Sequence, residues 1–151
     1  MTAVKIHGAL NDKNDPDHVR RNKHAKLYYD EIRNSKKAPW VEKVAANSKM
    51  DKTVIGEIYD HIFMTKHNFD GELKNFDPSY DMAESFRRLH AGKNIKPHDI
   101  VLLEHERLEI EFMKRYGLTQ NDAHILASRE FNYADALKEV EFNTCKYQPN
   151  G

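Results

Sequence analysis

One segment constrains the fold more than any other: residues 99–113, "DIVLLEHERLEIEFM". On a helical wheel, with about 100° between residues, its apolar side chains cover one wide arc. His105, Glu106 and Glu109 fall near the middle of that arc, away from the other charged residues. Because a buried carboxylate is costly unless it is compensated, each acid needs a cation, a donor or a metal. The segment therefore predicts a helix that directs three ionisable groups into the protein.

Helical signals also dominate the rest of the chain. They predict a mainly α fold, a compact bundle of about six or seven helices, with a possible short hairpin around residues 68–76. Expected helices cover residues 16–34, 39–47, 51–66, 78–91 and 97–116, a sixth begins at 120, and a seventh covers 133–140. The expected caps and stops are Asp15, Asp77 followed by Pro78, Gly92, Gly117, Thr119 with Asp122, and Asn132.

The expected organisation is a single helical domain over residues 15–142, after a flexible segment at 1–14 and before a loose tail at 143–151. The flexible segment contains at most a short strand, Val4–Ile6. The third to sixth helices should pack together. Their interior should contain Ile58, Ile62, Phe86, Leu102, Leu103, Ile110 and Met113.

Composition narrows the classes of protein to consider. The 151 residues are 39% hydrophobic and 32% charged, which is typical of a globular domain with its own core. One cysteine, Cys145, permits no internal disulfide. No apolar run is long enough for a membrane span or a signal peptide, so we expect any export to depend on another protein.

Charge is unevenly distributed along a chain with no net charge. Residues 17–52 hold ten Lys and Arg against five Asp and Glu, whereas residues 99–142 hold five against ten. One half could meet a polyanion and the other a basic partner, or both could simply be solvated surfaces.

The pentad "HERLE" places His105 and Glu109 one helical turn apart, so both can reach one point in space. Metallopeptidases use His-Glu-x-x-His in this way, with the first Glu as general base, and Glu106 has that place here. A zinc site of this kind needs one more histidine. The alternative is a structural ion-pair network that neutralises the acids in the core.

Two histidines elsewhere are candidates to complete the site. His124 lies on the sixth expected helix, which should return antiparallel to the fifth. His61 flanks the apolar stripe of the third, and His67 follows it. Taken singly, each is better explained as an ordinary half-buried histidine. Together, the sequence predicts catalytic roles for His105, Glu106, Glu109, His124 and His61, with His105, Glu109 and His124 as possible ligands of zinc or magnesium.

Basic residues form a second cluster in "SFRRLHAGKNIKPHD". We expect Arg87, Arg88, Lys93 and Lys96 to bind nucleic-acid phosphates, although cations near a helix C-terminus also complement its dipole. Residues 41–62 have the spacing of a helix-turn-helix, with Lys49, Lys52 and Thr53 directed toward DNA. A generic helical corner explains that spacing equally well.

Several strings together resemble a known family of toxin domains. They are "YYDEIRN", "FDPSYDMAESFRRLHAGKNI", "DIVLLEHERLE" and "DAHILASREFNY", within residues 26–133. The chain resembles C-terminal toxin domains of bacterial polymorphic toxins, of the LXG and contact-dependent growth inhibition types. The resemblance implies bacterial competition, delivery by a larger carrier protein, action in the cytoplasm of a target cell and a cognate immunity protein.

Three functions remain open at this point. The favoured one is a nuclease toxin, an RNase before a DNase, which cleaves phosphodiesters by His/Glu acid–base catalysis or with a divalent metal. An RNase that uses the 2′-hydroxyl needs no metal, whereas a metal makes DNA a possible substrate too. The alternatives are a zinc metallopeptidase that uses "HERLE" and a non-enzymatic helical module that binds nucleic acid.

Overall fold

The computed structural model describes residues 16–146, with side chains described through residue 139. Its elements confirm the mainly helical class. In chain order they are α1 (His18–Asn34), α2 (Lys37–Ser48), α3 (Lys52–Tyr59), the π-helical turn η2 (Asp60–Met64), β1 (His67–Phe69), β2 (Glu72–Lys74), α4 (Tyr80–Ala91), α5 (Pro97–Tyr116), α6 (Gln120–Glu130) and α7 (Tyr133–Lys146). The expected strand Val4–Ile6 lies outside the described residues.

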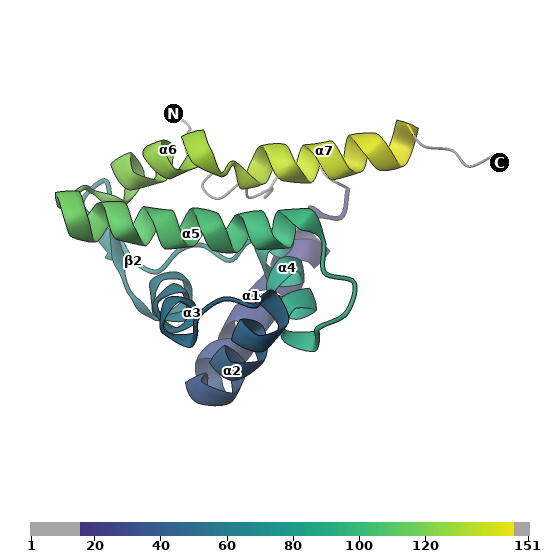
Figure 1. Ribbon diagram of the computed structural model, residues 1–151, viewed down its shortest axis with the longest axis horizontal. Coiled ribbons are helices and arrows are strands. Elements are labelled where there is room, and N and C mark those ends of the chain that lie inside the picture. The colour runs from purple at the N-terminus through teal and green to yellow at the C-terminus, as the bar shows by residue number, and fades with distance from the viewer. Residues whose placement is uncertain (1–15, 147–151) are drawn as a thin grey trace.

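The long helix α5 is the central element of the bundle. Figure 1 shows α6 and α7 along one side of α5, while α1 to α4 lie on the other. Only a three-residue connection, 117–119, separates α5 from α6, so the two helices pack antiparallel. This arrangement brings side chains from η2 on one side and α6 on the other to Glu109 of α5.

Local signals account for most helix ends. Gly117 ends α5 with φ 64°, a conformation that glycine adopts without strain. Thr119 Oγ1 accepts a hydrogen bond from the Asp122 amide at 3.1 Å and so caps α6. Asn132 Oδ1 accepts one from the Asp135 amide at 2.9 Å at the start of α7. These three predictions from sequence are confirmed.

Several helix ends differ from the sequence prediction. Helix α1 begins at His18 with Asp17 at its N-cap position, and the expected cap Asp15 lies outside the described residues. Helix α2 begins at Lys37, two residues before Pro39.

Asp77 and Pro78 do not begin α4: Ser79 caps it, because its Oγ accepts a hydrogen bond from the Met82 amide at 3.3 Å. Helix α7 continues to Lys146, four residues beyond the expected end of the domain at 142.

The third expected helix does not continue to Lys66. Helix α3 ends at Tyr59, and the Thr65 amide donates to the Asp60 carbonyl at 2.7 Å, a π-type hydrogen bond. The wider turn η2 leaves His61, Ile62 and Phe63 all buried. Three consecutive buried residues do not fit the periodicity of an α-helix, and π turns are frequent at functional sites. This turn determines which way His61 faces.

The predicted hairpin is present as the antiparallel pair β1 and β2. Asp70 and Gly71 connect the strands, with φ of 54° and 90°. Positive φ at both central residues is the requirement of a two-residue type I′ hairpin turn, and Asp-Gly satisfies it well.

The hydrophobic core lies between α1, α2, α3, η2 and α4 and the inner face of α5. Trp40 is in contact with Tyr59, Phe63 and Phe86, with ring centroids 5.3–5.7 Å apart. Six of the seven predicted core residues are buried; the exception is Met113, which is partly exposed where α5 borders a groove. Within residues 16–146, no helix combines the length and the apolarity needed to cross a membrane.

The corner between α2 and α3 matches the helix-turn-helix spacing in part. Met50 packs against the core, and Lys52 and Thr53 are exposed in the first turn of α3. A generic helical corner explains these positions, and DNA binding there stays a prediction.

The Trp40 contacts predict a large loss of stability on truncation. Trp40→Ala should lower the free energy of unfolding by about 3–5 kcal/mol, because it leaves a cavity among three aromatic rings. Leu27→Ala, on the exposed part of α1, should change it by less than about 0.5 kcal/mol. Urea unfolding followed by circular dichroism measures both. A loss at Trp40 no larger than that at Leu27 would contradict this description of the core.

Candidate metal centre

The three ionisable residues of α5 point into the protein, as the helical wheel predicted. His105 is 1% exposed, and Glu106 and Glu109 are fully buried. Since residues four apart lie on one face of a helix, His105 and Glu109 project side by side. The sequence prediction of a polar cluster inside the apolar face is therefore confirmed.

The Glu109 carboxylate is at the centre of this cluster. Its Oε1 lies 3.1 Å from His105 Nε2 and 3.2 Å from His124 Nδ1. Its Oε2 lies 2.6 Å from His61 Nε2 and accepts a hydrogen bond from Gln120 Nε2 at 3.3 Å. Thus both oxygens of one buried carboxylate face imidazole nitrogens, and the contacts come from η2, α5 and α6.

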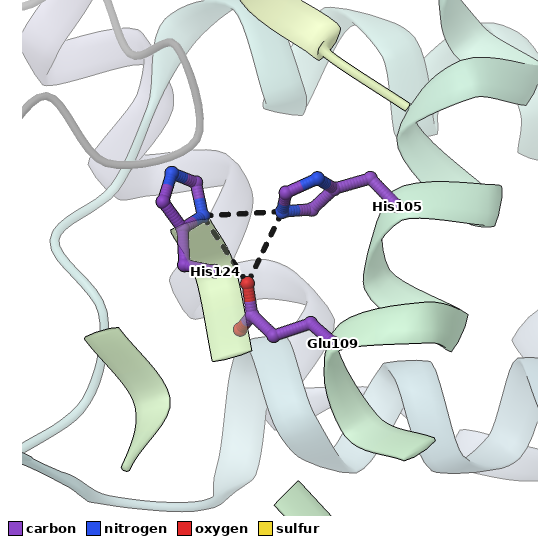
Figure 2. Close-up of side chains that lie close together, drawn as sticks. All are labelled: His105, Glu109 and His124. Atoms are coloured by element: carbon purple, nitrogen blue, oxygen red, sulfur yellow. Dashed lines mark hydrogen bonds and ion pairs between the residues drawn. The ribbon is translucent and has the colours of Figure 1, made fainter. Parts of the chain in front are cut away.

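Figure 2 shows that His105, Glu109 and His124 converge on one point. The two imidazole nitrogens are 3.1 Å apart, which is close to their distances from Glu109 Oε1. Ligand atoms about 2.1 Å from a tetrahedral ion lie about 3.4 Å from one another. The three atoms are therefore spaced as ligands of one ion require, and the antiparallel return of α6 supplies His124 as predicted.

A second group of possible ligands shares Glu109 with the first. His61, Glu106 and Glu109 offer ligand atoms that all lie within 4.8 Å of one another, and each of these side chains is buried. His61 Nε2 is 3.6 Å from Glu106 Oε1 and 2.6 Å from Glu109 Oε2. All five predicted catalytic residues thus belong to one cluster.

Backbone carbonyls fix the orientation of two histidines around the cluster. His105 Nδ1 donates a hydrogen bond to the Phe131 carbonyl at 2.9 Å, so Nε2 faces Glu109. His67 Nε2 donates to the His61 carbonyl at 2.9 Å and thereby supports η2. A carbonyl that accepts from the outer nitrogen of a histidine is a common way of orienting a metal ligand.

The acids of the cluster control the protonation of its histidines. Burial lowers the pKa of His105, but the hydrogen bond to Glu109 and the charges of Glu106 and Glu109 raise it to about 9. Burial also lowers the pKa of His61. The hydrogen bond to Glu109 and the charges of Glu109 and Glu106 outweigh this effect, so the pKa of His61 is raised. Without a metal, His105 and His61 therefore hold protons that compensate the buried carboxylates. A bound cation would replace those protons, so metal binding should release them.

An open groove of about 750 Å³ borders the cluster on the His61 side. It lies between β1, the C-terminal half of α5 and the start of α6, and Lys66 and Lys114 are among its lining residues. Gln120 lines it as well. Sequence reasoning missed Gln120 and the groove, because both depend on how β1 and α6 pack against α5. The only local signal for Gln120 was its place directly after the Thr119 cap.

The predicted basic cluster does not lie beside the His/Glu cluster. Arg88 donates two hydrogen bonds to the buried carboxylate of Asp99, both at 2.8 Å, and Arg87 donates to Glu84. Asp99 lies ten residues before Glu109 on α5, a separation of about 15 Å along the helix axis. Lys93 and Lys96 are exposed near the start of that helix. Arg88 thus holds α4 to α5, and phosphate binding by these four residues stays a prediction.

Comparison with known proteins assigns the chain to no family. No protein-family model matches the chain, and no curated protein or solved structure is detectably similar to it.

If the cluster holds a metal ion, metal should stabilise the folded chain. An ion that binds only the folded state stabilises it by about 2.7 kcal/mol at a hundredfold excess over Kd. For a chain of this size, that corresponds to a rise in Tm of roughly 5–10 °C. Differential scanning fluorimetry with Zn²⁺, Mn²⁺ or Mg²⁺, and then with a chelator, measures the shift and its reversal.

Glu109→Gln is the matched test of the ligand geometry, because glutamine has nearly the same shape without the charge. This change should weaken metal binding at least a hundredfold and abolish the Tm shift. Glu111→Gln alters a partly exposed acid that pairs with Arg107 and Arg115, so it should leave both unchanged. Equal metal affinity in the two variants would remove Glu109 from the site.

Proposed function

We propose that this chain is a divalent-metal-dependent hydrolase whose substrates are nucleic-acid phosphodiesters. One observation carries the proposal: three ligand atoms from α5 and α6, on His105, Glu109 and His124, lie 3.1–3.2 Å from one another. A purely structural ion pair would need only one cation for one carboxylate. Here three histidines surround a single carboxylate beside a second one, at a cost in core stability.

Some residues of such a site would bind the ion, and others orient the residues that bind it. His105 Nε2, His124 Nδ1 and Glu109 Oε1 would hold the ion, and the Phe131 carbonyl keeps the His105 ring in place. A divalent cation there would polarise a phosphoryl oxygen and lower the pKa of a water molecule. The side chain of His124 is 20% exposed, whereas Glu109 is fully buried. The ion would thus be held from the protein side and approached along His124 or through the groove.

Phosphodiesters are favoured as substrate by two features of the chain. Lys66 lines the groove beside His61 and would attract a polyanion there, whereas Lys114, which also lines it, is paired with Glu57. The resemblance to polymorphic toxin domains, many of which are nucleases, points the same way. In hydrolysis, the oxygen of water bonds to phosphorus, the ester P–O bond breaks and the leaving oxygen takes up a proton. This reaction needs no 2′-hydroxyl, so DNA is chemically possible, and the resemblance favours RNA.

The proposal includes a biological setting, which depends on the resemblance. In that setting the chain is a toxin domain delivered by a larger carrier protein into the cytoplasm of a target bacterium. A cognate immunity protein protects the producing cell. Such a partner should cover the groove or the exposed rim at His124, because access to the cluster is from there.

A zinc peptidase is the second candidate, and one observation favours it. The strand β1 lines the groove together with His61, and within the described residues it pairs only with β2. An extended peptide could therefore align along its other edge, as peptides do in β-augmentation. In this alternative Glu106 takes the proton of the attacking water, as the first Glu of "HERLE" predicts.

Activity should depend on both the metal and the α5 histidine. The purified chain is incubated with total RNA, plasmid DNA and a protein mixture, with and without a chelator. We expect cleavage of nucleic acid that the chelator stops and added Mn²⁺ or Zn²⁺ restores. Cleavage of protein alone would favour the peptidase, and RNA cleavage that persists with the chelator would favour metal-free acid–base catalysis.

His105→Ala should reduce cleavage at least a hundredfold and leave a folded protein, because it removes a ligand from a cluster that costs stability. His90→Ala, at a partly buried histidine on α4, is the matched control and should keep full activity. Thermal unfolding is measured beside the assay for each variant. If His105→Ala stays fully active, or if its inactivity only follows unfolding, the proposed site is wrong.

A further inference from the structure

The far side of the Glu109 carboxylate has its own set of possible ligands. Oε1 faces His105 and His124, and Figure 2 shows the other oxygen pointing away from these two rings. That oxygen, Oε2, faces His61 Nε2 at 2.6 Å. The proposed function leaves this side of the carboxylate without an assigned role.

The distances on this side fit an ion as well as a hydrogen bond. Two ligand atoms about 2.1 Å from a common ion cannot lie more than about 4.2 Å apart. His61 Nε2 meets this limit with both acids, at 2.6 Å from Glu109 Oε2 and 3.6 Å from Glu106 Oε1. The two acids come from consecutive turns of α5, and the π turn η2 brings His61 toward them.

We propose that His61, Glu106 and Glu109 hold a second divalent cation, so that Glu109 bridges a dinuclear centre. This inference rests on the proposed function in its nuclease form. One oxygen of Glu109 binds each ion, with His105 and His124 completing the first position and His61 and Glu106 the second. Bridging carboxylates of this kind hold the paired ions of many phosphatases and nucleases about 3.5–4 Å apart.

Charge in the cluster indicates what such a centre would bind. Two divalent cations bring four positive charges, whereas Glu106 and Glu109 supply two negative ones. A buried excess of positive charge is unfavourable unless anions complete it. A phosphodiester and a hydroxide would do so, and a neutral peptide bond would not. The charge of the dinuclear centre is therefore better balanced by a phosphodiester than by a peptide, although paired metal ions also serve some peptidases.

The groove gives the second position its access. His61 is one of its lining residues, and Thr119 and Gln120 at the start of α6 lie across from β1. A phosphodiester entering there would meet the His61 side of the cluster first, with Lys66 nearby. The second ion would thus be the one nearer the incoming substrate.

Metal stoichiometry tests the inference without any assay of activity. The full 151-residue chain is stripped with a chelator, equilibrated with Mn²⁺ by dialysis and analysed for bound manganese. Two ions per chain are expected, together with the electron paramagnetic resonance spectrum of an exchange-coupled pair. One ion per chain with an uncoupled six-line spectrum would overturn the inference.

Variants assign each ion to its position. His61→Ala and Glu106→Gln should each bind one Mn²⁺ and lose the coupled spectrum, as should His124→Ala on the other side. His90→Ala should keep two ions and the coupled spectrum. Glu106→Gln keeps the test decisive if His61→Ala disturbs η2. Two ions in both His61→Ala and Glu106→Gln would place the second ion elsewhere and refute the assignment.

The inference and the proposed function fail in distinguishable ways. One bound ion with chelator-sensitive cleavage of nucleic acid would leave the proposed function standing and refute the second position. Two bound ions without cleavage of RNA or DNA would support the dinuclear centre and refute the substrate. No bound ion would contradict both.

Discussion

The buried carboxylate of Glu109 is the constraint on which the arrangement of this protein depends. It contacts His105 on its own helix, His61 in the π turn and His124 and Gln120 on α6. These elements must all be in place before the carboxylate is compensated. Burial of an uncompensated charge costs several kcal/mol, so the native packing and the protonation of the cluster are coupled.

The same cluster makes the core less stable than an apolar core of the same size would be. Apolar residues at the three ionisable positions of α5 would often be neutral or stabilising. A charged network in this position is easier to understand if chemistry requires it, because active sites are where stability and activity conflict. The aromatic cluster around Trp40 supplies apolar packing on the side of the bundle away from α6 and α7.

Features that depend on local sequence could be predicted, and those that depend on packing could not. The wheel of α5 showed that His105, Glu106 and Glu109 point inward, since helical periodicity is a local property. The sequence also predicted the N-cap Thr119 and the helix-ending Gly117. By contrast, the apolar spacing of residues 51–66 predicts one continuous α-helix, and nothing in that spacing indicates the π turn at Asp60–Met64.

The features of the candidate site that the sequence did not predict have the same physical origin. Arg88 was predicted to bind phosphate because its basic neighbourhood is visible in the sequence, but its partner Asp99 is found only when α4 packs on α5. Gln120 and the groove likewise depend on the approach of β1 and α6 to α5. His61 and His124 were correctly chosen as candidates, yet only the fold shows that they face opposite oxygens of one carboxylate.

The central claim is that this His/Glu cluster is a metal centre, and anomalous X-ray diffraction from crystals soaked in Mn²⁺ tests it most directly. The account predicts anomalous peaks within about 2.0–2.3 Å of the Glu109 carboxylate oxygens, one beside His105 and His124 and one beside His61. A cluster without any peak at saturating Mn²⁺, with its histidines still hydrogen-bonded to Glu109, would contradict it. The cluster would then be a structural ion-pair network.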